Sequence, residues 1–126
     1  MNTYIIILGE ITNKIGDEKF ANFVDTNNFE FWRHTPLNWI LLTPKNVKLD
    51  TINRELKKAY GQVFICVLKV AIEGFAGHYL AKRREDNPFN WFKDIYIKEG
   101  FVPKWENVQE NEIDLDDDGQ IGLTLE

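Results

Sequence analysis

Serine is absent from the 126 residues, and the chain contains a single cysteine, Cys66, and two histidines, His34 and His78. The absence of serine excludes a serine nucleophile, and a lone cysteine cannot form an internal disulfide. Two histidines and one cysteine are too few for a closed zinc site. No glycine-rich phosphate loop and no G-x-S-x-G elbow is present. Most covalent hydrolase chemistry is therefore excluded.

Long apolar runs are also missing. A membrane span needs roughly 18 or more consecutive uncharged residues, and the apolar stretches here are interrupted by Pro44, Lys69 or Glu73. The first residues lack the basic segment of a signal peptide. We therefore expect a cytoplasmic location and no membrane partner. A hydrophobic content of 44% with nine Phe, four Tyr and four Trp predicts one globular domain with a substantial core.

Basic side chains are missing from the C-terminal residues 105–126, which hold eight acids: Glu106, Glu110, Glu112, Asp114, Asp116, Asp117, Asp118 and Glu126. Residues 1–104 hold all 15 basic side chains and 12 of the 20 acidic ones, a net charge of +3. The overall net charge of −5 thus describes neither part. We expect a single domain over residues 1–104, with a C-terminal helical addition, and an acidic tail over residues 105–126.

Apolar runs and helical spacing alternate along the first 70 residues. Three runs rich in β-branched or large apolar residues predict strands, over residues 4–8, 37–42 and 63–68. Residues 29–32 alternate as a strand does, and Pro36 marks the turn of a hairpin with the next strand. Apolar residues at helical spacing predict helices over residues 17–25, begun by Asp17, and over residues 50–60, begun by Asp50 and ended by Gly61.

The order strand, helix, strand, strand, helix, strand predicts a ferredoxin-like α+β sandwich, βαββαβ, with both helices on one face of a four-stranded antiparallel sheet. A split βαβ arrangement is the alternative. We expect residues 4–8 and 63–68 to be interior strands, so that Cys66 is a buried small hydrophobe. Asn87 and Pro88 predict the start of an extra C-terminal helix, with an edge strand over residues 91–97 as the alternative.

Several of these features together resemble a known family. They are the aromatic pair Phe31-Trp32, the run Trp39-Ile40-Leu41, the helix over residues 50–60, and the strand over residues 63–70 that leads into residues 74–77. Over residues 1–80 the chain resembles the small CRISPR adaptation proteins and their SinR-like and VapD-like relatives. This resemblance implies a ferredoxin-like fold, dimerisation through sheet edges and a connection with nucleic acids.

The resemblance also points to a candidate catalytic position. Members with nuclease activity are expected to carry an aspartate at the end of the first strand, where two copies hold a metal. Gly9 and Glu10 stand there in this chain. Glu10 is the candidate catalytic carboxylate, although a shift of one residue turns its side chain to the other face of the strand.

Two charged motifs provide further candidate sites. Lys82, Arg83 and Arg84 form a basic cluster able to contact nucleic-acid phosphates, and a solvated helix end is the alternative. The tail reproduces the opening of an EF-hand loop, in which calcium or magnesium would be held by Asp114, Asp116, Asp118 and Gln120. Leu125 stands where the bidentate glutamate belongs, so a flexible acidic tail is the alternative reading.

These features favour a non-enzymatic macromolecular interaction module, which we expect to be a homodimer with a protein or nucleic-acid partner. A metal-dependent endonuclease that uses Glu10 is the alternative. A third hypothesis is an accessory protein of a phage or toxin system, whose acidic tail imitates nucleic acid. The residues identify neither the partner nor the pathway.

Overall fold

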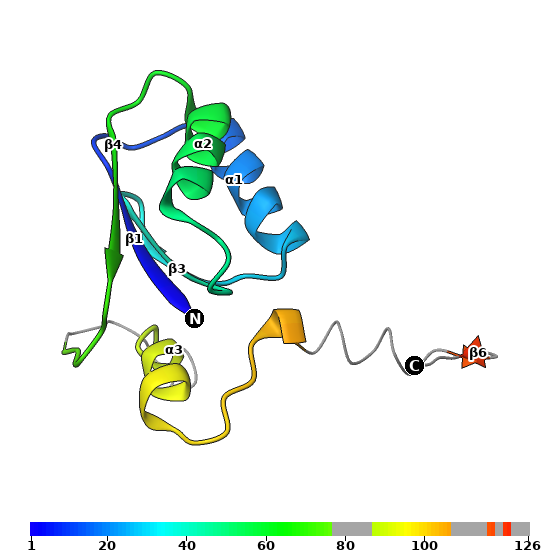
Figure 1. Cartoon of the computed structure of the whole chain (residues 1–126). Coiled ribbons are helices and arrows are strands. Elements are labelled where there is room, and N and C mark those ends of the chain that lie inside the picture. The colour runs from blue at the N-terminus through cyan, green and yellow to red at the C-terminus, as the bar shows by residue number, and fades with distance from the viewer. Residues whose placement is uncertain (77–86, 107–115, 118–119, 122–126) are drawn as a thin grey trace.

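The N-terminal half of the chain forms a sheet and two helices, and a shorter helical segment lies at one end of the sheet (Figure 1). The computed structural model describes residues 1–76 and 87–106, together with the backbone of residues 116–117 and 120–121. Its elements are β1 Asn2–Leu8, α1 Lys14–Thr26, β2 Glu30–Thr35, β3 Asn38–Thr43, α2 Leu49–Tyr60, β4 Ile65–Val70, α3 Asn90–Phe92, the π-helix η2 Lys93–Ile97, β5 Asp116–Asp117 and β6 Gln120–Ile121.

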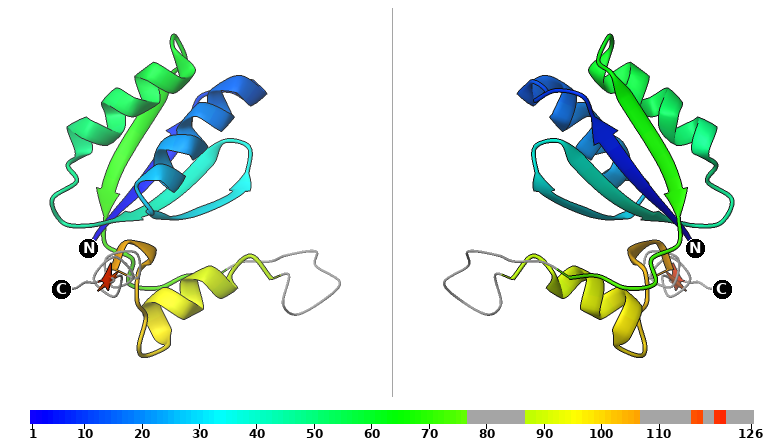
Figure 2. Two further views of the ribbon diagram at one scale, coloured as in Figure 1. Left: turned by 90° about the vertical axis from the view of Figure 1, so that its right-hand side faces the viewer. Right: turned by 90° about the vertical axis from the view of Figure 1, so that its left-hand side faces the viewer.

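The main sheet has the strand order β2-β3-β1-β4, and every neighbouring pair is antiparallel. Helices α1 and α2 lie side by side on one face of this sheet (Figures 1 and 2). The order, the pairing and the one-sided helices together define the ferredoxin-like sandwich and confirm the predicted fold class. The β2–β3 hairpin is also confirmed, with Pro36 in its turn.

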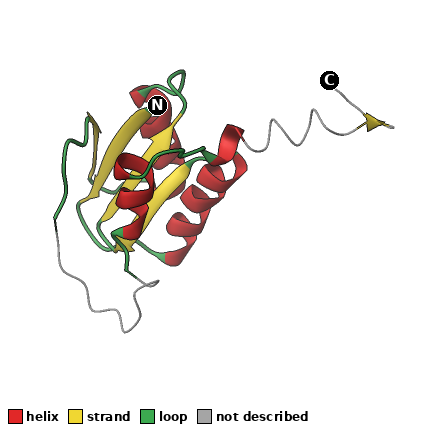
Figure 3. Ribbon diagram, turned by 90° about the horizontal axis from the view of Figure 1, so that it is seen from below, coloured by secondary structure: helices red, strands yellow, loops and turns green. Residues whose placement is uncertain are grey.

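The core lies between the sheet and the two helices, whose ribbons Figure 3 shows packed against the sheet. Side chains alternate between the two faces of a strand, and the β1 residues Tyr4, Ile6 and Leu8 face the helices with at most 2% of their surface exposed. They belong to the same cluster as the buried helix residues Phe20, Val24, Ile52 and Leu56. Burying each of the large aliphatic side chains contributes about 1.5–3 kcal/mol, so this cluster is the main source of stability.

Helix α1 begins earlier than predicted. Its N-cap is Asn13, whose side-chain oxygen accepts a hydrogen bond of 2.8 Å from the Gly16 N–H. Asp17, the predicted cap, lies in the first turn, and its carboxylate is used in tertiary contacts instead. The apolar spacing did not reveal the first turn because Lys14 and Ile15 are exposed.

Helix α2 also differs from the prediction at its start. Its N-cap is Lys48, which makes no side-chain capping bond, and the predicted cap Asp50 lies in the first turn. A carboxylate there favours the helix through the positive end of the helix dipole. The predicted end is confirmed, since Gly61 has φ of 70° and closes the helix with a hydrogen bond from its N–H to the Lys57 carbonyl.

The prediction that residues 63–68 form an interior strand is wrong. The strand is β4, Ile65–Val70, and it lies at the edge of the sheet with β1 as its one neighbour in the described chain. Cys66 is only half-buried. The physical reason is that the last strand of this topology has a neighbour on one side, and that the two main helices cover one face of the sheet.

The C-terminal segment 87–106 packs against the sheet near Thr3 and Trp32. The predicted helix there is present as the short α3 followed by η2, and not as an edge strand. It is attached to the sheet by hydrogen bonds from Trp32 Nε1 to the Pro88 carbonyl at 2.8 Å and between the Thr3 and Tyr96 hydroxyls at 3.0 Å. Within the described ranges, no helix is long and apolar enough to cross a membrane.

A glycine at the contact of α1 and α2 tests this packing. A Cβ atom added at Gly16 would lie 2.6 Å from Tyr60 Cδ1, so we expect Gly16→Ala to displace the tyrosine ring and lower the free energy of unfolding by about 1–3 kcal/mol. Gly74→Ala is the matched control, because no atom lies within 4 Å of its added Cβ. Urea denaturation of both variants measures the difference. Equal stability of the two would contradict the close helix contact.

Candidate functional site

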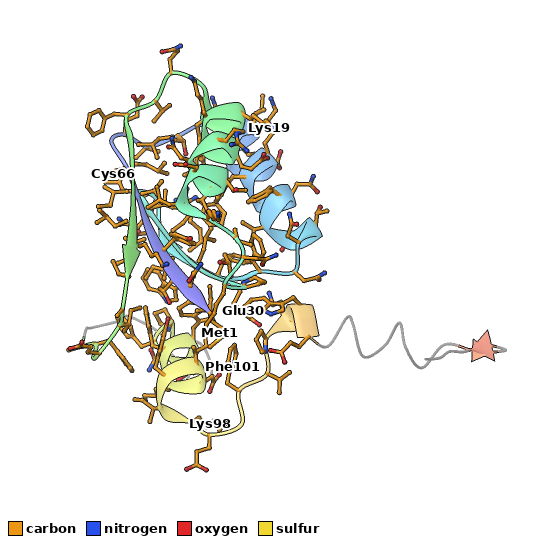
Figure 4. All side chains as sticks on the ribbon, in the orientation of Figure 1. Met1, Lys19, Glu30, Cys66, Lys98 and Phe101 are labelled. Carbon is orange, nitrogen blue, oxygen red and sulfur yellow. The ribbon has the colours of Figure 1, made fainter. Side chains whose placement is uncertain are left out.

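The face of the sheet that points away from α1 and α2 carries an uncharged, partly exposed surface. We call it the open sheet face, and it consists of Ile5, Ile7, Phe64, Cys66 and Leu68. The register places these side chains together, because Ile5 pairs with Leu68 and Ile7 pairs with Cys66. The Gly9 N–H donates to the Phe64 carbonyl at 2.7 Å and so continues the same ladder. Figure 4 shows Cys66 on the upper part of β4, away from α3.

One end of this side of the sheet is covered and the other is open. At the covered end, Thr3 and Leu42 are 7% and 1% exposed, and Thr3 contacts Tyr96 of η2. At the other end, Ile7 is 40% exposed and Leu68 is 44% exposed. Because all four side chains point from the same face, the difference comes from the position of the C-terminal segment. The open sheet face is thus the part that this segment leaves uncovered.

The lack of a side chain at Gly9 allows the end of β1 to approach Phe64 closely. A Cβ atom there would lie 2.9 Å from Phe64 Cβ and 3.1 Å from the Phe64 carbonyl oxygen. Without that atom, β1 and the residues before β4 approach closely, and the ring of Phe64 stands 79% exposed. The resemblance to nucleases draws attention to Gly9 as the place of a missing aspartate. In this structure its direct effect is to leave room for Phe64.

Charge is absent from the open sheet face and present beside it. None of its five side chains is an acid, a lysine, an arginine or a histidine. Lys69 is the nearest charge along β4, and it points to the other face because it pairs with Tyr4. Contiguous exposed apolar surface of this kind marks interaction sites in soluble proteins.

A polar cluster lies on the opposite side of the sheet, around Asp17. One oxygen of Asp17 accepts hydrogen bonds from Thr12 at 2.6 Å, from Tyr60 at 2.7 Å and from Arg33 Nη2 at 3.0 Å. The Tyr60 hydroxyl also accepts a bond of 3.1 Å from Trp39 Nε1. The Arg33 guanidinium lies 4.8 Å above the Trp39 ring. The cluster therefore joins α1, α2 and the β2–β3 hairpin.

The electrostatics of this cluster favour a neutral tyrosine. Burial, followed by the hydrogen bond to Asp17, raises the pKa of Tyr60 to about 12. A group with this pKa is a poor proton donor or nucleophile at neutral pH. Each group in the cluster is hydrogen-bonded to another, so the cluster contributes to the folded structure.

The predicted catalytic carboxylate, Glu10, is exposed in the loop after β1. The part of the chain that the structure describes holds no group of three or more His, Cys, Asp or Glu side chains that could bind a metal ion. His34 is exposed at the end of β2, with its ring 5.0 Å from that of Trp32. The structure thus does not bring the described candidates together into one site.

The remaining sequence candidates lie outside the described residues, or nearly so. Lys82, Arg83, Arg84 and His78 are outside them, as are Asp114 and Asp118. For Asp116 and Gln120 the structure gives the backbone, in the antiparallel pair β5–β6. The proposed nucleic-acid cluster and the proposed calcium or magnesium loop therefore stay predictions.

Sequence reasoning missed the open sheet face because the run over residues 63–68 looked like a buried strand. A signal for its exposure was nevertheless available. In a βαββαβ sandwich the last strand lies at a sheet edge, and a strand with apolar residues on both of its faces at an edge must expose some of them. Combining the predicted topology with the apolar pattern would have located this surface.

No family model and no curated protein matches the chain. Among solved structures, it is similar to the crystal structure of acylphosphatase from Bacillus subtilis, with a TM-score of 0.43 and 20% sequence identity. The match covers 59% of this chain and 91% of that one. The likeness to the small CRISPR adaptation proteins stays a prediction beyond the shared ferredoxin-like fold.

The Asp17 cluster leads to a prediction about pH. Tyr60→Phe removes the acceptor of the buried Trp39 N–H, so we expect it to lower the free energy of unfolding by about 1–3 kcal/mol at pH 7. The folded-state pKa of Tyr60 is raised from 10.0 to about 12, so its stabilising effect is complete below pH 10 and is lost as the pH rises towards 12. The gap between wild type and variant, measured by urea denaturation, should therefore narrow over that range. A gap that stays constant would show that another group titrates.

A second prediction concerns Glu10. Glu10 is exposed, and the described residues hold no group of three or more His, Cys, Asp or Glu side chains that could bind a metal ion. We therefore expect no cleavage of RNA or DNA with magnesium or manganese. The measurement is incubation of labelled single- and double-stranded substrates with each metal, using Glu10→Ala and the exposed Glu18→Ala as a matched pair. Cleavage that Glu10→Ala abolishes and Glu18→Ala retains would establish the nuclease alternative.

Proposed function

We propose that the chain is a non-enzymatic interaction module that forms a homodimer through its open sheet face. The observation that carries this proposal is the exposure of Ile7, Phe64 and Leu68 side by side on two paired strands. Together they expose apolar surface of about a few hundred Å², the size of the largest patch on a typical monomer, which is often functional. Leaving such a patch in water is unfavourable by about 25 cal/mol per Å².

A second copy of the chain is the partner that fits this surface. Residues 1–104 hold 15 basic and 12 acidic side chains, so the folded bodies of two copies, each with a net positive charge, repel each other at long range. The open sheet face carries no acid and no base, so two copies in contact there avoid that repulsion at short range. An isologous contact also covers both apolar patches at once.

The edge of the sheet supports the same arrangement. β4 has one strand neighbour in the described chain, so its outer backbone groups face away from the sheet. An exposed apolar edge strand pairs readily with another strand. If β4 lies at the centre of the dimer, its apolar side chains form the contact and its outer edge borders it.

In such a dimer α1, α2 and their charged outer surfaces stay accessible to a further macromolecule. The connection with nucleic acids or with CRISPR, toxin or phage-defence systems is the finer part of this proposal, and it is supported by the sequence resemblance. The cluster Lys82–Arg84 is where we expect such a contact.

The dimer is tested by placing a charge in the open sheet face. Leu68→Glu should convert a dimer into a monomer, because two carboxylates would be buried at the two-fold axis without partners. Leu68 is 44% exposed, so a single chain tolerates the change. Ile15→Glu on α1 is the matched control, since Ile15 is 66% exposed on the far side of the sheet and should leave the dimer intact. Sedimentation equilibrium gives the mass of each.

Cys66 provides an independent measurement of the same contact. A thiol reagent should modify Cys66 slowly at protein concentrations where the dimer forms and quickly after dilution. In Leu68→Glu the reaction should be fast at every concentration. A wild-type protein that sediments as a monomer, with Cys66 reactivity independent of concentration, would rule out this interface.

A further inference from the structure

A cavity of about 300 Å³ lies between the loop that follows β4 and the π-helix η2. Its described lining comes from these two segments: Ile72, Glu73, Gly74, Phe75, Tyr96 and Ile97. The two segments are distant in sequence and meet at the end of the sheet where the C-terminal segment packs (Figure 1). Its volume is at the lower end of the range for small-molecule sites. π-helical segments such as η2 frequently occur at functional sites.

Phe75 and Tyr96 contribute aromatic rings to the lining of this cavity, and contacts with Phe92 hold both rings in place. The Phe75 ring is stacked on Phe92 at a centroid distance of 5.2 Å, and Phe92 is stacked on Tyr96 at 6.4 Å. The Tyr96 hydroxyl is bonded to the Thr3 hydroxyl at 3.0 Å. Phe92 is 6% exposed and fixes both neighbours. The rings of Phe75 and Tyr96 are thereby pre-organised, which lowers the entropy cost of binding a ligand.

Among the described residues that line the cavity, the formal charge is negative. Glu73 is the one ionisable carboxylate there, and no lysine, arginine or histidine accompanies it. Aromatic ring faces carry negative electrostatic potential and attract cations. A carboxylate next to two such rings favours a cation with an apolar stem and disfavours phosphates and other anions. Ile72 and Ile97 supply the apolar contact for that stem.

We propose that this cavity binds an organic cation, a primary ammonium or guanidinium group on a short alkyl stem. Glu73 pairs with the charged group, and Phe75 and Tyr96 contact its stem and its face. The same chemistry occurs in a lysine or arginine side chain of a protein partner and in a free diamine. This inference is independent of the proposed dimer, whose surface is built from other residues.

Two cationic probes distinguish these sources. Binding of putrescine and of lysine capped as its N-acetyl methylamide is followed by the fluorescence of the chain's tryptophans, of which Trp91 lies 6.5 Å from Tyr96, and by NMR shifts of the residues that line the cavity. Pentanol is the neutral probe of similar length. We expect both cations to bind more tightly than pentanol. Tighter binding of the capped lysine would indicate a protein side chain as the ligand, and tighter binding of putrescine a free diamine.

Substitution of the carboxylate provides the decisive comparison. Glu73→Gln keeps the shape of the side chain and removes its charge, and should weaken the binding of the cations roughly two- to fivefold, because Glu73 is exposed. Glu18→Gln is the matched control, because Glu18 is exposed on α1, and it should bind as the wild type does. Phe75→Leu should also weaken both cations while the unfolding midpoint shows that the protein is folded. Equal affinity for pentanol and the cations, or unchanged affinity in Glu73→Gln, would overturn the proposal.

Discussion

The double antiparallel pairing of β1 is the constraint on which the rest of the structure depends. β1 is hydrogen-bonded to β3 along one edge and to β4 along the other. With both edges occupied, the strand fixes the register of its neighbours, and the period of two then decides which side chains face the helices. A slip of one residue would move Tyr4, Ile6 and Leu8 out of the core. The register of β1 therefore determines both which side chains pack against the helices and which side chains form the open sheet face.

The two faces of this sheet are stabilised by different means. The inner face packs against two amphipathic helices, and the Asp17 cluster fastens α1 and α2 to the β2–β3 hairpin through hydrogen bonds. The outer face is covered at one end by α3 and η2, which are attached through Trp32 and Tyr96. Incomplete coverage creates both surfaces on which the functional proposals rest. The open sheet face is where coverage stops, and the cation cavity is where the covering segment meets the loop after β4.

The fold was accessible from sequence because its signals are local and repeat along the chain. Apolar runs, the helical spacing of Phe20 and Val24 or of Ile52 and Leu56, and the turn at Pro36 were enough to order the elements. Helix starts were less accessible, since Asn13 and Asp17 are both good capping residues and the tertiary partner of Asp17 decides between them. The exposure of β4 and the cavity beside η2 depend on contacts between segments that are distant in sequence, which no local pattern contains.

The residues of β4 bear on the proposed dimer. Edge strands of monomeric proteins are usually protected by inward charges, prolines, bulges or a covering segment. β4 contains no proline, and its one charge, Lys69, lies on the helix side of the sheet. The register of this sheet shifts on the opposite edge, between Trp32 and Thr35 of β2. β2 is also covered by the C-terminal segment through Trp32 and Glu30. Among the described residues, one edge is thus protected twice and the other only by Lys69, an asymmetry that supports the proposed contact of β4 with a second chain.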